Sequence, residues 1–373
     1  MLTYGVTMSY TLRVTLTLQL RLLPDPAQRR MLLTTMERFN AAASHAARVG
    51  FEAKVFSQPA IHHRCYRELR ERFGLSAQMA VRAIGKAAEV FRRDKSRCPV
   101  FTPRGAMTYD ERLMSFKGMD RVSLLTLEGR QRVPLVFGEY QRARFDRLKG
   151  QCDLVYRKGQ FFLYASLDLP PKPPIEITDF LGVDLGIANL AVDSDGRQHS
   201  GAAVEAVRQR HHRLRQRLQK LGTKGAKKLL RRLAGREARF RRHENHCIAK
   251  RLVTTCKDTA RGLALENLQG IRTRTTVRRR DRARHAGWAF GQLREFLEYK
   301  AALAGVPVAV VDPRNTSRTC SRCGHCEKAN RKDQATFVCR HCTSSLHADI
   351  NAARNIRARA ACKPAPELAR LSA

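Results

Sequence analysis

The chain has 373 residues, enough for two or three domains that each bury a core. Its 71 lysine and arginine residues against 33 acidic ones give a formal net charge of +38. Such an excess is unfavourable as self-repulsion unless a polyanion binds, so nucleic acid is the expected partner. The charge alone is equally typical of a ribosomal or chromatin protein that only coats phosphate. No apolar run approaches the ~20 residues that span a bilayer, so no membrane partner is expected.

Residues 10–22 alternate between apolar and polar side chains, which predicts a β-strand. The strand ends at Pro24-Asp25-Pro26, after which the pattern becomes helical to about residue 95. Short strands are predicted from Val122 to Leu169, with a hairpin that turns at Lys158-Gly159. The N-terminal half therefore reads as a β-rich module interrupted by a helical lobe.

The run Pro170-Pro171-Lys172-Pro173-Pro174 is stiff and extended, so we place the main domain boundary there. Two arginine-rich helices are then expected between about 203 and 258, joined at Gly222 to Gly225. The other elements expected in chain order are a strand-turn-strand unit at 180–192, an apolar segment at 262–268, a basic stretch from Arg272 to Arg284, a helix at 288–304, a strand at 306–311 and a helix at 347–359.

Three acidic residues lie within apolar patterns. In Leu181-Gly182-Val183-Asp184-Leu185, the alternation puts Asp184 and Gly182 on the strand face opposite the three apolar residues. The segment from Leu263 to Glu266 repeats this arrangement, with Ala264 on the same face as Glu266. On the last helix, Asp349 shares a flank with Ala353 and Ile356. All three carboxylates are therefore expected to point inward.

Each acid alone has a structural alternative. Asp184 could shape a turn before Gly186, Glu266 could pair with an arginine, and Asp349 could cap its helix. Together, three buried acids must be paired, protonated or bound to cations. Hard oxygen ligands select magnesium or manganese, and two such ions roughly 4 Å apart suit the cleavage of a phosphodiester. The trio is therefore a candidate catalytic and magnesium site.

The cysteines favour a reducing compartment and a zinc site. Five of the eleven lie between Cys320 and Cys342, and the other six are scattered. The pairs Cys320-x2-Cys323 and Cys339-x2-Cys342 are fifteen residues apart, as in a zinc ribbon with four thiolate ligands and a structural ion. The spare donors, which leave one ligand open to doubt, are Cys326, His325 and His341.

These motifs resemble those of the TnpB family, the OrfB-type proteins of bacterial insertion sequences, and of their relatives the type V CRISPR effectors. Phe180 to Val192 is similar to the first RuvC motif, and Ala264 to Leu268 is similar to the second. The blocks from Thr316 to Arg331 and from His347 to Ile356 resemble the zinc insert and the third motif. The chain departs from the family at Cys326 and at Thr343, where glycine is common.

The resemblance implies a multidomain α/β fold, with an RNase H-like (RuvC) nuclease core and an inserted zinc ribbon. The core would follow a β-barrel-like wedge module that a helical recognition lobe interrupts. The implied division is 1–24 as the first strand or strands of the wedge, 25–110 as the helical lobe, 111–177 as the rest of the wedge, 178–312 as the core with a helical insertion at 203–258, 313–346 as the zinc-binding insert, 347–359 as the last core helix, and 360–373 as a disordered tail.

The function that the resemblance implies is RNA-guided DNA cleavage beside a short adjacent motif, by a transposon-encoded, magnesium-dependent endodeoxyribonuclease with a single active site. Its cofactors would be two Mg²⁺ or Mn²⁺ ions on Asp184, Glu266 and Asp349, one Zn²⁺ and a guide RNA. Its partners would be that RNA, from the transposon end, and double-stranded target DNA, bound by a monomer in a prokaryotic cytoplasm at the nucleoid. Two alternatives are a DNA strand-transferase of the same fold and a non-catalytic nucleic-acid-binding regulator.

Overall fold

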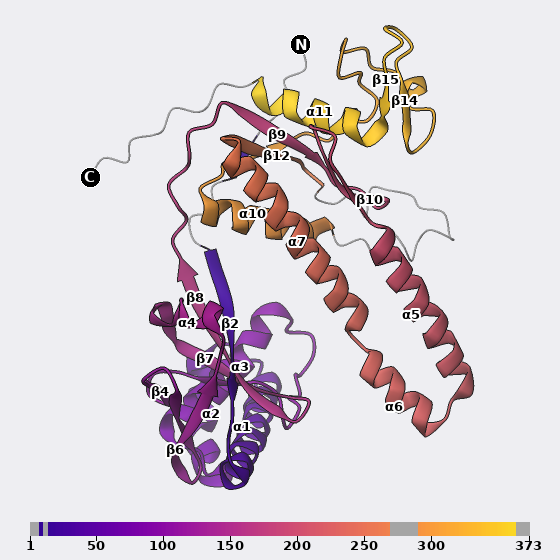
Figure 1. The fold of residues 1–373 in the computed structure, drawn as a ribbon. Coiled ribbons are helices and arrows are strands. Elements are labelled where there is room, and N and C mark those ends of the chain that lie inside the picture. Colours follow the sequence, from indigo (N-terminus) through magenta and orange to yellow (C-terminus); the bar gives the residue numbers. More distant parts are fainter. Residues whose placement is uncertain (1–6, 10–13, 269–289, 363–373) are drawn as a thin grey trace. The chain divides into compact units, whose positions relative to one another are not determined.

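The structure is a computed structural model that describes residues 7–9, 14–268 and 290–362 (Figure 1). The chain forms two compact units. The N-terminal unit comprises residues 15–169, and the C-terminal unit comprises residues 170–373 together with residues 1–14. The basic stretch from Arg272 to Arg284, Trp288 and the expected tail beyond Cys362 lie outside the described residues.

Three helices form the helical part of the N-terminal unit: α1 (Pro26–Glu52), α2 (Gln58–Phe73) and α3 (Ala77–Arg93). Helix α1 begins after the predicted break because Asp25 caps it. The Asp25 carboxylate accepts the backbone N–H of Gln28 at 2.8 Å, and the Gln28 side chain accepts the N–H of Asp25 at 3.2 Å. Since α3 ends at Arg93, the predicted helical region to about residue 95 is confirmed.

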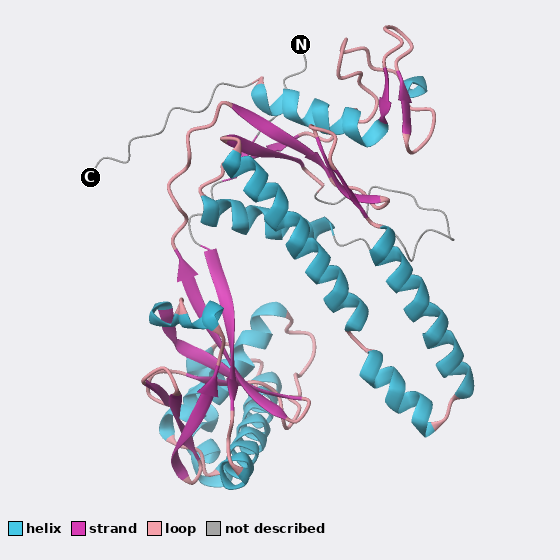
Figure 2. Cartoon of the chain, viewed as in Figure 1, coloured by secondary structure: helices cyan, strands magenta, loops and turns pink. Residues whose placement is uncertain are grey.

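The same unit contains a seven-stranded sheet with the order β3-β7-β8-β2-β6-β5-β4 (Figure 2). The predicted hairpin is confirmed, because β7 and β8 pair antiparallel and turn at Lys158 and Gly159. Both turn residues have positive φ, 52° and 79°, as a tight two-residue hairpin requires. The strands are β2 (Val14–Leu22), β3 (Met107–Tyr109), β4 (Met114–Lys117), β5 (Arg121–Thr126), β6 (Gly129–Val136), β7 (Leu148–Arg157) and β8 (Gln160–Leu169), and the short helices are α4 (Glu139–Arg142) and a 3₁₀ turn (Phe145–Arg147).

The C-terminal unit is built on a six-stranded sheet with the order β1-β13-β12-β9-β10-β11. Its three central strands, β13, β12 and β9, are parallel, and the outer strands pair antiparallel. The strands are β1 (Thr7–Ser9), β9 (Asp179–Asp184), β10 (Asn189–Asp193), β11 (Gln198–Ser200), β12 (Arg261–Glu266) and β13 (Val308–Val311).

The first 24 residues do not stay together as the sequence suggested. Strand β1 pairs with β13 in the C-terminal unit, whereas β2 belongs to the sheet of the N-terminal unit. A strand of three residues is too short to show an alternating pattern, so its pairing was not visible in the sequence.

Helices cover both faces of the six-stranded sheet (Figure 1). Leu181, Val183 and Leu185 of β9 and its end pack against α7 (Arg236–Asp258) and α10 (Phe290–Ala304). On the opposite face, Ala264 and Val311 pack against α11 (Ala348–Ala361). The predicted alternation along β9 is confirmed, because its apolar residues and Gly182 face different helices.

The arginine-rich segment forms three helices and not the two expected, namely α5 (Ala202–Leu221), α6 (Lys224–Leu233) and α7. The first joint lies where glycines predicted it, with Gly222 at φ 61°. The second joint is at Gly235, whose φ of 78° ends the helical path because this left-handed conformation does not continue an α-helix. Among the described residues, no helix is long and apolar enough to cross a membrane.

Candidate active site

The sheet brings two of the three predicted carboxylates to adjacent positions. Strands β9 and β12 run parallel, and their last paired residues are Val183 and Leu265. The next residue on each strand is an acid, Asp184 on β9 and Glu266 on β12. Because side chains at matching positions of neighbouring strands point to the same face, both carboxylates leave the sheet on the side of α11.

Asp349 enters this site from α11, which lies unusually close to β9. A Cβ added to Gly182 would lie 2.6 Å from the backbone nitrogen of Arg357 and closer still to the carbonyl oxygen of Ala353. Glycine at this position therefore lets the helix backbone touch the strand. The sequence placed Gly182 on the same strand face as Asp184, and in the structure this face packs against the helix that carries Asp349.

The three carboxylates repel one another in a partly desolvated site. Burial raises the pKa of Asp184 well above its usual range, and the charges of Glu266 and Asp349 raise it further. Burial also raises the pKa of Glu266, although the Thr316 hydroxyl and nearby arginines act against that rise. A divalent cation would reduce this repulsion, and carboxylate oxygens are the donors that magnesium or manganese prefers. The residues present therefore fit the predicted ion.

Neighbouring side chains orient two of the acids. The Asn189 amide donates to Asp349 Oδ2 at 3.1 Å, and the guanidinium of Arg331 lies 3.9 Å from Asp349 Oδ1. The Thr316 hydroxyl donates to Glu266 Oε1. Sequence reasoning missed all three residues, although each lies within or beside a motif that carried the resemblance.

The helix-capping alternative for Asp349 is not what the structure shows. The N-cap of α11 is His347, whose ring nitrogen accepts the backbone N–H of Asp349 at 3.3 Å. Glu266 is only 9% exposed, and the hydrogen bond that holds it comes from Thr316 and not from an arginine. Both acids are therefore left with carboxylate oxygens available for a ligand.

The four predicted zinc ligands converge. The sulfur atoms of the four cysteines all lie within 4.8 Å of one another, a group formed by Cys320, Cys323, Cys339 and Cys342. The backbone N–H of Cys342 lies 3.4 Å from the Cys339 sulfur, and such hydrogen bonds lower the pKa of the Cys339 thiol to about 6. Four thiol donors without an open position fit a structural zinc ion.

The spare donors are not part of this cluster. The rings of His325 and His341 stack on each other, with centroids 5.6 Å apart, and His325 lies 3.2 Å from a carboxylate oxygen of Glu327. Cys326 is exposed and bridges through its backbone to Thr319. Among the described residues, the group that could hold a metal ion consists of the four cysteines and includes none of these three side chains.

Buried asparagines fasten the zinc-binding insert, residues 313–346, to α11. The Asn351 amide accepts the N–H of Ser321 at 2.9 Å and donates to the carbonyl of Thr319 at 2.8 Å. The Asn355 amide donates to the carbonyls of Thr316 and Thr319 at 2.8 and 2.7 Å. Within the insert are a 3₁₀ turn (Lys328–Asn330), β14 (Thr336–Val338) and β15 (Ser345–His347).

The two cysteine pairs are each followed by a residue with a left-handed backbone, but the residue type differs between them. Gly324 follows Cys323 with φ 78°, and Thr343 follows Cys342 with φ 57°. Both positions need the left-handed conformation, which is strained for a β-branched side chain. The departure from glycine noted in the sequence therefore introduces strain beside the zinc ligands.

Two family models match this chain. The model described as "Probable transposase" matches residues 164–272, which include Asp184 and Glu266. The model described as "Cas12f1-like, TNB domain" matches residues 290–356, which include the four zinc-binding cysteines and Asp349. A TnpB-like protein of Methanocaldococcus jannaschii, MJ0751, is 25% identical over 65% of this chain and 92% of its own length. These matches confirm the resemblance to the TnpB family.

Two other curated relatives of this TnpB-like chain carry nuclease names. The CRISPR-associated endodeoxyribonuclease Cas12f1 of Sulfoacidibacillus thermotolerans is 30% identical over 54% of this chain. The putative RNA-guided DNA endonuclease InsQ of Escherichia coli K12 is 26% identical over 54% of it. The chain spans about half the length of these two relatives, 50% and 54%.

The fold agrees with that of a type V effector. A solved structure titled "Cryo-EM structure of the Cas12f1-sgRNA-target DNA complex" aligns with a TM-score of 0.64 and 14% identity. The alignment covers 93% of this chain and 99% of the other. The predicted multidomain α/β architecture is thereby confirmed.

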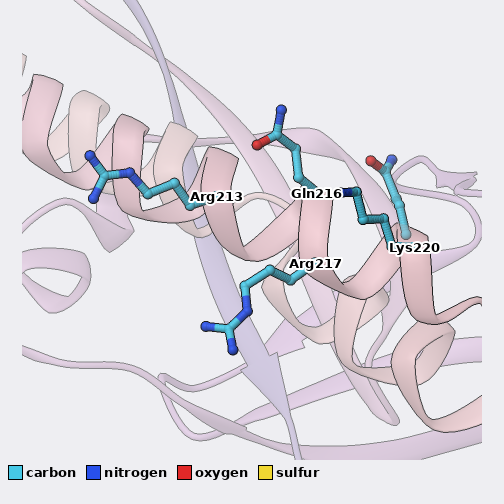
Figure 3. Close-up of a pocket in the computed structure, with 5 residues that line it drawn as sticks. Arg213, Gln216, Arg217 and Lys220 are labelled. Carbon is cyan, nitrogen blue, oxygen red and sulfur yellow. The ribbon is translucent and has the colours of Figure 1, made fainter.

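The chain also has a basic groove on α5, away from the three acids in the sequence. The groove has a volume of about 720 Å³, and Figure 3 shows that its labelled side chains come from one helix. Its cations, Arg213, Arg217 and Lys220, are named here the α5 stripe; they are exposed, and no ion pair engages them among the described residues. Arg208 and Arg215 on the same helix are instead paired with glutamates.

Proposed function

We propose that this protein is a transposon-encoded, RNA-guided DNA endonuclease that cuts beside a short adjacent motif with a single RuvC-like active site. The observation that carries the proposal is the convergence of Asp184, Glu266 and Asp349 from β9, β12 and α11. Three clustered acids, of which Asp184 and Glu266 have pKa values raised by burial, are unfavourable for folding alone. Relatives that carry endonuclease names support the same conclusion.

Asp184, Glu266 and Asp349 would hold the catalytic Mg²⁺ or Mn²⁺ ions. Two such ions bound together activate a water molecule and stabilise the departing oxygen of a phosphodiester. The protein's part is to fix the three carboxylates. The Asn189 amide holds one oxygen of Asp349, the Thr316 hydroxyl holds one oxygen of Glu266, and the contact of α11 with Gly182 sets the distance between helix and strand.

The excess of positive charge is proposed to bind a guide RNA and its target DNA. A net charge of +38 exceeds what solubility needs, and base pairing by the RNA would select the target sequence. We assign the N-terminal unit to a wedge β-module with a recognition lobe, and the C-terminal unit to the RNase H-like core with its zinc ribbon. The protein would act as a monomer on one RNA, in a prokaryotic cytoplasm, at the nucleoid.

The α5 stripe is a described surface suited to a phosphate backbone. Arg213, Arg217 and Lys220 lie four and three residues apart, so they share one face of the helix. Their lack of carboxylate partners distinguishes them from the paired arginines of the same helix. We therefore propose that α5, one of the arginine-rich helices predicted from the sequence, contributes to nucleic-acid binding.

The test is cleavage of a matched plasmid library with magnesium, by protein co-expressed with a candidate guide RNA from its own locus. Asp184→Ala should slow cleavage by roughly a thousandfold or more, because losing a metal ligand removes several kcal/mol of transition-state stabilisation. Asp258→Ala, which removes an exposed acid at the end of α7, is the matched control and should cut normally.

Two other results would support the rival functions. Guide-independent joining of DNA ends would identify a strand-transferase. RNA binding without any metal-dependent cleavage, unchanged in Asp184→Ala, would identify a non-catalytic regulator. If Asp184→Ala protein cleaves DNA at the full wild-type rate, the proposed catalytic role of the three carboxylates is wrong.

A further inference from the structure

The carboxylate of Glu266 is held by a residue near the start of the zinc-binding insert, Thr316. Glu266 ends β12 and is 9% exposed, and its Oε1 atom accepts the hydroxyl hydrogen of Thr316. No other side-chain hydrogen bond to Glu266 is present among the described residues. The orientation of this carboxylate therefore depends on a single hydroxyl group.

Thr316 itself is fixed from two sides. It is 3% exposed, and its hydroxyl oxygen lies 3.1 Å from the carbonyl of Pro313. Its own carbonyl accepts the Asn355 amide of α11 at 2.8 Å, and the same amide donates to the Thr319 carbonyl at 2.7 Å. Asn355 is 7% exposed, so these hydrogen bonds are shielded from water and are correspondingly strong.

Helix α11 thus acts on two of the three acids. It carries Asp349 in its first turn, and through Asn355 it holds the residue that orients Glu266. We propose that Thr316 is a positioning residue, whose hydroxyl turns one oxygen of Glu266 away from the shared site and so presents the other oxygen to a divalent cation beside Asp184 and Asp349. This inference rests on the proposed function, because it gives the three acids a common ligand.

The physical basis is the freedom of an unrestrained glutamate. Its last torsion is broad, so a carboxylate without a hydrogen-bond partner samples many orientations. A hydroxyl that occupies one lone-pair site of Oε1 restricts that rotation while leaving Oε2 free. Groups that orient a metal ligand in this way change metal affinity by roughly 10- to 100-fold when removed.

The test compares Mn²⁺ binding by the full-length, zinc-loaded chain in calorimetry, without nucleic acid. Thr316→Val keeps the shape but lacks the hydroxyl, and it should weaken Mn²⁺ binding by about 10- to 100-fold. Thr316→Ser restores the hydroxyl and should bind within a few-fold of the wild type. A purely structural role for Thr316 would not predict this rescue.

Thr336→Val is the matched control. The Thr336 hydroxyl also interacts with a carboxylate of the insert, that of the exposed Asp333, and within the described part of the chain it makes no hydrogen bond to the three acids. This variant should bind Mn²⁺ as the wild type does. Zinc content and thermal unfolding show whether each variant is folded, and Thr316→Ala, with the same expected loss, replaces Thr316→Val if the latter does not fold.

The outcomes separate this inference from the proposed function. Mn²⁺ binding that is lost in Asp184→Ala but equal in Thr316→Val and the wild type would overturn the positioning role alone. Wild-type protein without any Asp184-dependent Mn²⁺ binding would overturn both. Loss in Thr316→Val with recovery in Thr316→Ser is the result we expect.

Discussion

Helix α11 leaves no room for a Cβ on Gly182 of β9, so the structure makes a sharp prediction for Gly182→Ala. The new Cβ would lie 2.6 Å from the backbone nitrogen of Arg357, and closer to the carbonyl oxygen of Ala353. Ordinary contacts are about 3.5 Å or more, so α11 would have to move away by about 1 Å. Neither contact can be relieved by a side-chain rotation, because both partners are backbone atoms.

That displacement should affect activity more than folding. Asp349 is part of α11 and would move with it, and a misplacement of ~1 Å at a reacting centre lowers the rate on the order of 100-fold. Overpacking of this kind destabilises a fold by about 1–3 kcal/mol, which a core of this size can tolerate. We therefore expect Gly182→Ala protein to fold and to cleave guide-matched DNA about 100-fold more slowly.

The assay is single-turnover cleavage with saturating guide RNA and target, together with thermal unfolding. The control is Gly291→Ala on α10, where an added Cβ meets no atom of the described residues within 4 Å. This control should cleave at the wild-type rate and should be unchanged or slightly more stable. Wild-type cleavage and wild-type stability in Gly182→Ala would refute the argument that the glycine sets the position of Asp349.

Three further predictions concern the rest of the molecule. Thr343→Gly should stabilise the zinc-binding insert by about 1 kcal/mol, because glycine adopts the left-handed conformation without strain; slower zinc release to a chelator would show it. Replacing the three cations of the α5 stripe by glutamine should reduce the slope of log affinity for guide RNA against log salt concentration by up to about 2 units. The control is Arg215→Gln, which should leave this slope nearly unchanged because Arg215 is already paired with Glu237. Without divalent cations, the free energy of unfolding should fall as pH rises toward and through the raised pKa of Asp184, because the folded state holds more protons than the unfolded state in this range. Chemical denaturation at a series of pH values would measure this dependence, and Asp184→Asn should make it flatter.

The two strand carboxylates could be predicted because a strand displays its faces in the sequence. Alternation around Asp184 and Glu266 placed both on one face, and the structure puts the two strands side by side in parallel register. What alternation could not supply was which strands are neighbours. That pairing depends on how the chain between the two strands, which includes α5, α6 and α7, returns to the sheet.

Contacts of single side chains across the fold were beyond sequence reasoning. Arg331 and Thr316 approach the acids only because the zinc-binding insert folds back against α11. Gly235 was also missed as a break, because an isolated glycine is compatible with a helical pattern and its positive φ is a property of the folded chain. The short β1 strand was missed because three residues carry no periodicity.

Helix α11 explains why the third motif is so dense in constrained residues. One flank, with Ile356 and Ala360, packs on the sheet, and Ala353 lies against the backbone of β9. Another flank, with Asn351 and Asn355 four residues apart, fastens the zinc-binding insert. Asp349 lies in the first turn of the same helix and belongs to neither of these two flanks. Helix α11 packs on the sheet, fastens the zinc-binding insert and carries Asp349, all within 14 residues. Few of its positions are therefore free of a structural or chemical constraint. For this reason the motif is recognisable in the sequence, although its contacts are not.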